Sequence, residues 1–221
     1  MQHKVSILSI EPITHDVIRF VVEKPGAYSF HSGQATDVSI NKEDWMEEKR
    51  PFTFTSLPGD DHLEFTIKTY PSHEGVTNQL LHLLPGDELI LHDVFGDIGY
   101  KGEGVFIAGG AGVTPFISIF RDLKAKNELA NNKLICANKR HSDIILENEF
   151  KELLHDNFIN ILSEQETEEY AHGYINKEFL APHVLAGKYV YLCGPPPMMD
   201  AVEKILSQLK VPEKLLVKEG F

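Results

Sequence analysis

Hydrophobic and polar residues alternate in short segments along the first hundred residues. Residues 63–68, Leu-Glu-Phe-Thr-Ile-Lys, alternate without exception, as expected of a strand with one buried face. Segments 15–22, 36–40 and 49–56 have a similar character, and turn sequences containing glycine and proline separate them. Short strands at this spacing predict a small antiparallel barrel or sandwich.

The pattern changes near residue 100. Residues 104–108, Gly-Val-Phe-Ile-Ala, form a continuous apolar run that is typical of a strand buried on both faces. Apolar residues then recur at helical spacing from 116 to 123, and short apolar strands alternate with helix-like segments. This alternation predicts a parallel sheet covered by helices. We therefore predict two packed domains, residues 1–100 and residues 101–221.

Charge and cysteine content narrow the functional classes. The chain has 21 Lys and Arg against 33 Asp and Glu, and a formal charge of −12 disfavours nucleic-acid binding. We see neither a signal peptide nor a membrane-spanning segment, and predict a cytoplasmic protein without membrane insertion. Two cysteines cannot form a four-thiolate iron–sulfur centre, and no zinc-motif spacing occurs, so we predict no metal site.

A glycine-rich segment, residues 109–115, directly follows the apolar strand and opens a helix. Glycine lets the backbone approach a ligand closely, and amides at a helix start attract phosphate. We predict Thr114 as the N-cap and Pro115 as the first helical residue. A standard G-x-G-x-x-G fingerprint would require glycine at position 115, so a tight strand-to-helix turn without a ligand is the alternative.

The sequence Cys193-Gly194-Pro195-Pro196-Pro197-Met198 follows the last strand predicted in the parallel sheet. Ligands of open α/β sheets bind at the carboxyl ends of the strands. The three prolines predict a rigid, extended segment before a helix that begins near Met199. The two loops together favour a ligand site at this edge of the sheet.

These motifs, in this order, resemble the ferredoxin–NADP reductase-like flavoproteins. Residues 50–53, Arg-Pro-Phe-Thr, resemble that family's Arg-x-Tyr-Ser/Thr strand, and residues 75–77, Gly-Val-Thr, are similar to its pyrophosphate-binding helix start. The terminal residues 219–221, Glu-Gly-Phe, resemble the Glu-x-aromatic terminus of plant-type reductases. The resemblance implies an antiparallel Greek-key β-barrel that binds FAD, followed by a doubly wound parallel-sheet domain that binds NADH or NADPH.

The resemblance also implies roles for individual residues. Arg50 would pair with the flavin phosphates, which suits its permanent charge and forked donors. The implied FAD-binding residues are Arg50, Pro51, Phe52, Thr53, Gly75, Val76, Thr77 and Phe221. The implied nucleotide-binding residues are Gly110, Gly112, Val113, Thr114, Glu164, Cys193, Gly194, Pro195 and Met198. Strand alternation places Arg50 and Phe52 on one face and directs Thr53 elsewhere unless the strand end twists.

Four of the implied roles are catalytic. Thr53 would hydrogen-bond near the reactive flavin nitrogen, and Cys193 would lie beside the hydride-donating ring. Glu219 would help to move protons. Phe221 would cover the flavin face that nicotinamide must reach.

Two departures from the family pattern bear on specificity. Phe52 replaces the usual tyrosine, as it does in relatives that use flavin as a loosely held substrate. Glu164 follows Ser163 where plant-type enzymes have an arginine for the 2′-phosphate of NADPH. A carboxylate repels that phosphate and accepts hydrogen bonds from ribose hydroxyls, which favours NADH, although Lys139 and Arg140 counteract it.

The expected function is an FAD-dependent NAD(P)H reductase that serves a separate acceptor such as a flavodoxin or ferredoxin. Those acceptors are typically acidic, so docking would need a local basic patch at Lys49 and Arg50 or at Lys124 and Lys126. Two alternatives stay open, a reductase of free flavin and a non-catalytic flavin- and nucleotide-binding subunit of a larger complex.

Overall fold

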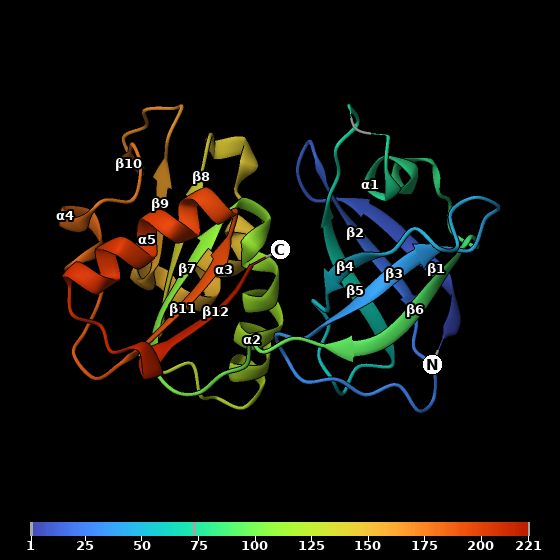
Figure 1. Ribbon diagram of the computed structural model, residues 1–221, viewed down its shortest axis with the longest axis horizontal. Coiled ribbons are helices and arrows are strands. Elements are labelled where there is room, and N and C mark those ends of the chain that lie inside the picture. Colours follow the sequence, from blue (N-terminus) through green and yellow to red (C-terminus); the bar gives the residue numbers. More distant parts are fainter. Residues whose placement is uncertain (1, 73, 221) are drawn as a thin grey trace.

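The computed structural model describes residues 2–72 and 74–220, and within them the chain forms two six-stranded sheets, one after the other (Figure 1). The first sheet consists of β1 (His3–Pro12), β2 (Val17–Glu23), β3 (Ala35–Ile40), β4 (Arg50–Thr53), β5 (His62–Lys68) and β6 (Glu88–Phe95). The second consists of β7 (Gly104–Gly109), β8 (Lys133–Asn138), β9 (Phe158–Leu162), β10 (Ala171–His172), β11 (Tyr189–Gly194) and β12 (Leu216–Gly220). The predicted domain boundary, residue 100, lies between β6 and β7.

The first sheet is an antiparallel barrel. Its strand order is β4-β3-β6-β1-β2-β5, and every pairing is antiparallel. A bridge between Phe54 and Phe65 links the end of β4 to β5 and closes the barrel. Because neighbouring strands are not all consecutive along the chain, the connections are of the Greek-key type, as predicted.

Apolar side chains from both sides of the barrel fill its interior, and Phe20, Val22 and Leu63 are fully buried. One short helical segment, α1 (Val76–Gln79) followed by the 3₁₀ turn η1 (Leu80–His82), packs Val76 and Leu80 into the same core. The start of α1 is therefore held in place by the barrel interior.

The second sheet is parallel and doubly wound. Its strand order is β10-β9-β8-β7-β11-β12, so the order reverses between β7 and β11. The helices are α2 (Thr114–Ala125), α3 (Glu147–Leu154), α4 (Lys177–Leu180) and α5 (Pro196–Gln208). The 3₁₀ turns are η2 (Gly110–Val113), η3 (His141–Asp143), η4 (His155–Asn157) and η5 (Glu213–Leu215).

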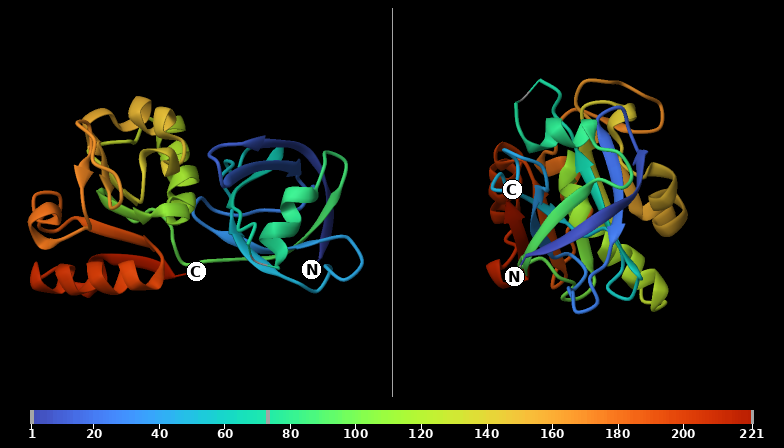
Figure 2. Two further views of the ribbon diagram at one scale, coloured as in Figure 1. Left: turned by 90° about the horizontal axis from the view of Figure 1, so that it is seen from above. Right: turned by 90° about the vertical axis from the view of Figure 1, so that its right-hand side faces the viewer.

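The apolar run in β7 is buried on both faces, as predicted. Phe106 and Ala108 belong to the core beneath α2 and α3, whereas Val105 and Ile107 belong to the core beneath α4 and α5. Helix α2 lies on the side of this sheet that faces the barrel (Figures 1 and 2). No helix among the described residues is long and apolar enough to cross a membrane.

Three local predictions were wrong. Helix α2 begins at Thr114 with Val113 as its N-cap, and the Thr114 hydroxyl donates to the Ala111 carbonyl instead of capping the helix. Helix α5 begins at Pro196 and not near Met199, because proline is well suited to the first turn of a helix. The polar face of β5 was expected to face solvent, but it is buried, and Arg121 on α2 donates to Glu64 there.

Candidate functional site

The point where the strand order reverses lies between β7 and β11, which pair in parallel. The two strands end at Gly109 and Gly194, and the two predicted nucleotide loops follow directly. In open α/β sheets this reversal leaves a crevice outside the carboxyl ends of the strands, where ligands bind. The structure thus brings the two loops together.

Three of the glycines let these loops pack against each other. A Cβ added at Gly112 would overlap the carbonyl oxygen of Cys193 and lie 2.6 Å from its carbonyl carbon. A Cβ at Gly109 would overlap the Met198 sulfur, and one at Gly194 would lie 2.9 Å from it. The close packing of the two loops against each other therefore requires glycine at these positions, independently of any bound ligand.

Gly110 is different, since its position opens onto free space. Its φ is +52°, a conformation that favours glycine, and an added Cβ would meet no atom within 4 Å. Helix α2 starts four residues later, and no side chain caps its amides. The 3₁₀ turn η2 runs directly into α2, and the Thr114 amide donates to the Ala111 carbonyl oxygen, so the open backbone at Gly110, where this helical segment begins, is the part that fits the pyrophosphate of a dinucleotide.

Cys193 and Glu219, two of the residues predicted to be catalytic, lie side by side on neighbouring strands. They are partners in the register of β11 and β12. Cys193 is buried, and burial together with the nearby Glu219 charge raises the pKa of its thiol, so the sulfur stays protonated. Burial also raises the pKa of the Glu219 carboxyl, and the charge of Asp97 adds to the effect. Phe221, the fourth predicted catalytic residue, lies outside the described residues.

The predicted flavin strand, β4, comes first in the strand order of the barrel sheet and pairs regularly with β3 from Arg50 to Thr53. Arg50 and Phe52 therefore share a face, while Thr53 lies on the opposite one and is buried. Arg50 is half-exposed, donates from Nη1 to the Lys49 carbonyl at 2.6 Å and lies 3.8 Å from Glu48. Its exposed guanidinium fits a phosphate partner.

The start of α1 also fits a phosphate. Gly75 is the N-cap, no side chain caps the helix, and a Cβ at Gly75 would meet no atom within 4 Å. Amides in the first turn of a helix have no partner within it. Since the Val76 side chain is anchored in the barrel core, the amides of Val76 and Thr77 are held in a fixed position.

Glu164 is not an isolated carboxylate. Its Oε1 lies 2.9 Å from Lys139 Nζ, and its Oε2 lies 3.7 Å from Arg140 Nε. The hydrogen bond from Lys139 lowers the pKa of Glu164. A cavity of about 730 Å³ lies beside this cluster, with Arg140 and Glu164 in its lining. The repulsion expected from Glu164 alone is therefore offset by two cations at the same site.

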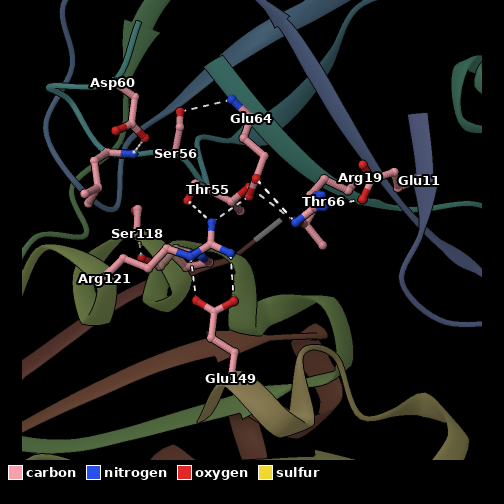
Figure 3. A network of polar contacts seen from close by, with 12 residues as sticks. Glu11, Arg19, Thr55, Ser56, Asp60, Glu64, Thr66, Ser118, Arg121 and Glu149 are labelled. Atoms are coloured by element: carbon pink, nitrogen blue, oxygen red, sulfur yellow. Dashed lines mark hydrogen bonds and ion pairs between the residues drawn. The ribbon is translucent and has the colours of Figure 1, made fainter. Parts of the chain in front are cut away.

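The sequence interpretation missed a polar network between the domains (Figure 3). Arg121, on α2, donates to Glu64 on β5 and to Glu149 on α3. No motif marks Arg121, and the alternating pattern of β5 predicts that Glu64 faces solvent. In residues 2–72 and 74–220, no group of His, Cys, Asp and Glu side chains has a geometry that would hold a metal ion.

Comparison with known protein families assigns both halves of the chain. Residues 2–95 match the family model of an FAD-binding domain. Residues 106–204 match that of an oxidoreductase NAD-binding domain. The two matches follow each other in the same order as the barrel and the parallel sheet.

Two characterised relatives align with most of the chain. The reductase component of propane 2-monooxygenase from Mycolicibacterium goodii is 30% identical, over 99% of this chain and 67% of the relative. NADH-cytochrome b5 reductase 2 from Mycosarcoma maydis is 29% identical, over 89% of this chain and 63% of the relative. The chain thus spans about two thirds of the length of these relatives.

The fold agrees with a solved structure over almost its whole length. A ferredoxin NADP⁺ reductase from Neisseria gonorrhoeae, with bound FAD and NADP, superposes with a TM-score of 0.83 at 17% identity, covering 99% of this chain and 98% of that one. The barrel, the parallel sheet, the two domain matches and the relatives all indicate the same family. The chain therefore belongs to the ferredoxin–NADP reductase-like flavoprotein superfamily, a family of FAD-dependent NAD(P)H oxidoreductases.

Proposed function

We propose that this protein takes hydride from a nicotinamide dinucleotide onto FAD and delivers the electrons to a separate protein acceptor. The observation that carries the proposal is the meeting of the two glycine-containing loops where the strand order reverses between β7 and β11, beside Cys193 and Glu219. The acceptor is supported by the relative named as the reductase component of a monooxygenase. A small ferredoxin- or flavodoxin-like protein is the acceptor class we favour.

On the flavin side, Arg50 and the amides of Val76 and Thr77 hold the phosphates, and Phe52 lies against the flavin. Pro51 and Gly75 shape the backbone at these two places. The Thr53 side chain lies on the opposite face of β4, so Thr53 hydrogen-bonds near the reactive flavin nitrogen through its main chain. When bound, FAD accepts a hydride and releases its electrons one at a time, and the protein supplies binding, orientation and electrostatics.

On the nucleotide side, the backbone from Gly110 to Thr114 holds the pyrophosphate. The segment Gly194–Met198 lines the opposite wall, with Pro195 in an extended conformation (φ −61°, ψ 142°). Cys193 places the nicotinamide ring, and its protonated thiol adds no negative charge near the transferred hydride. Glu164 accepts from the adenosine ribose hydroxyls, which favours NADH.

Glu219 exchanges the proton that accompanies flavin reduction and reoxidation. Its raised pKa brings the carboxyl closer to the pH range in which it can both donate and accept. Phe221, two residues further along, is proposed to stack on the flavin and to be displaced by nicotinamide. Deleting Phe221 should then tighten nucleotide binding and change the flavin spectrum.

The visible spectrum of the purified protein, before and after anaerobic addition of NADH or NADPH, tests this proposal. We expect bound FAD, bleaching by the nucleotide and reoxidation by an added ferredoxin or flavodoxin. Colourless protein that turns over only with added flavin would identify a free-flavin reductase, the alternative that Phe52 favours. Protein that binds both ligands but never bleaches would identify a non-catalytic subunit.

A further inference from the structure

A single guanidinium joins the two domains. Arg121 Nη1 donates to the Thr55 carbonyl oxygen at 2.7 Å and to Glu64 Oε1 at 2.6 Å, both on the barrel. Arg121 Nε and Nη2 donate to the two carboxylate oxygens of Glu149 on α3, at 2.6 and 2.8 Å (Figure 3). Arg121 therefore contacts one carboxylate in each domain at the same time.

This network is largely withdrawn from water. The side chains of Arg121 and Glu64 are 20% and 9% exposed. Burial lowers the pKa of Arg121, but the hydrogen bonds and charges of Glu149 and Glu64 outweigh it and raise the pKa overall. Charge-assisted hydrogen bonds in such surroundings are stronger and more directional than surface ion pairs.

The barrel side of the network is itself fixed by hydrogen bonds. The Thr55 hydroxyl donates to Glu64 Oε1 at 2.8 Å, and the Glu64 amide donates to the Ser56 hydroxyl at 3.0 Å. Arg19 Nη1 lies 3.9 Å from Glu64 Oε2 and adds a second cation. Glu64 is thus a rigid acceptor, and movement of Arg121 relative to it would break several contacts together.

A second contact lies one turn earlier on α2. The Gly33 amide, in the β2–β3 connection, donates to the Ser118 hydroxyl at 3.0 Å in a buried position. A side chain at Gly33 would meet the Ile98 carbonyl oxygen at 2.6 Å and Ile119 Cδ1 at 3.1 Å, so the barrel and α2 are closely packed here. Two contacts along α2 fix the orientation of this helix on the barrel as well as its position.

The Arg121 network lies close along the chain to the proposed site on both the α2 side and the barrel side. Helix α2 begins at Thr114, where the nucleotide loop ends, and Arg121 lies two turns further along. On the barrel, the Thr55 carbonyl is two residues beyond Thr53 of the flavin strand. The network therefore connects the segment proposed to hold the nicotinamide nucleotide, the hydride donor, to the segment proposed to hold the flavin, the hydride acceptor.

We propose that Arg121 is a positioning residue for hydride transfer, which sets the orientation of the nucleotide domain on the barrel through Thr55 and Glu64. Hydride transfer depends steeply on geometry, and a displacement of about 1 Å costs about 100-fold in rate. Lysine cannot replace arginine fully, because only the planar fork reaches both carboxylates and the carbonyl together. The inference rests on the site proposed above but not on the identity of the electron acceptor.

Anaerobic stopped-flow reduction of the FAD-loaded protein by saturating NADH tests the proposal, because no acceptor takes part. Arg121→Met should lower the rate of reduction per bound flavin roughly 10- to 100-fold. Arg121→Lys should recover part of the loss, and Glu64→Gln, which weakens only the barrel contact, should show a smaller loss. Lys204→Met, which removes an exposed cation on α5, is the matched control and should match the wild type.

A second measurement does not depend on turnover. Hydrogen exchange should become faster in Arg121→Met and Glu64→Gln at residues 55–56 and 118–121, while the barrel interior keeps its protection. The affinities for FAD and NADH should change by less than about threefold, because neither Arg121 nor Glu64 is among the residues proposed to bind these ligands. A purely structural role would instead lower the melting temperature and FAD content with an unchanged rate per bound flavin, and that result would overturn the proposal. Wild-type protein that neither nucleotide reduces would refute the proposed function first.

Discussion

Cys193 and Glu219 lie opposite each other in the parallel register of β11 and β12, so the last strand of the sheet brings a carboxyl group to the end of the strand that carries the thiol. The Glu219 charge contributes to the raised pKa of Cys193, and burial raises the pKa of both groups. Both side chains therefore favour their protonated, neutral forms more than they would in water.

Replacing Glu219 with glutamine should change the pH dependence of stability. Because the pKa of Glu219 is raised in the folded state, its protonated form stabilises the fold, and this contribution is lost as the pH rises through the folded-state pKa, which lies above 4.5. The wild type should thus lose stability relative to Glu219→Gln as the pH rises above 4.5, the ordinary pKa of a glutamate carboxyl. Melting temperatures of both proteins across that range test this, and a constant difference would contradict it.

Gly112 and Gly110 offer a matched pair of substitutions in one loop. Gly112→Ala places a methyl group against the Cys193 backbone, which is held in strand β11. The variant should lower the unfolding free energy by about 1–3 kcal/mol and should also weaken nucleotide binding. Gly110→Ala meets no atom and should cost only the strain of its positive φ, about 1 kcal/mol. Urea unfolding and nucleotide titration measure both effects. Equal stabilities of the two variants would contradict the packing role of Gly112.

The barrel and the parallel sheet could be predicted because their buried strands leave simple patterns. The continuous apolar run of β7 reports burial on both faces, and the loops after β7 and β11 carry recognisable glycine and proline motifs. Strand β1 was missed because a bulge between Ile7 and Ser9 interrupts its alternation. Strand β12 was missed because it is short and lies at the sheet edge.

The contacts between the domains could not be predicted. The alternation in β5 assigns Glu64 to solvent, yet a helix more than 50 residues away along the chain covers it with Arg121. Sequence pattern records the polarity of a side chain but not the partner that neutralises it. The cluster at Glu164 was easier to anticipate, since Lys139 and Arg140 follow the strand next to β9.

Arg50→Ala should weaken FAD binding about tenfold or more, because it removes a charge-assisted hydrogen bond to phosphate. Lys49→Ala, which removes the neighbouring cation in the chain, is the control and should have a much smaller effect. Quenching of flavin fluorescence on titration with apoprotein gives both dissociation constants. Equal affinities of the two variants would place the flavin phosphates away from β4.

Glu164 provides the sharpest test of nucleotide preference. Its carboxylate stays ionised because the hydrogen bond from Lys139 lowers its pKa. The ionised carboxylate pairs with Lys139 and Arg140, two cations that would otherwise attract a 2′-phosphate. Glu164→Gln keeps an oxygen that can accept from ribose but releases both cations. We therefore expect the kcat/KM for NADPH relative to NADH to rise about tenfold, equivalent to about 1.4 kcal/mol.

Two further variants distinguish a local effect from a general change in charge. Glu166→Gln removes a carboxylate two residues away whose side chain is 85% exposed, and it should leave the ratio unchanged. Adding Lys139→Met to Glu164→Gln should reverse much of the gain, since the released ammonium is then absent. If the ratio stays constant in Glu164→Gln, the 2′-phosphate binds elsewhere. If Glu166→Gln raises it equally, the net charge of the protein, and not the cluster at Glu164, sets the preference, because only a long-range field acts equally at both positions.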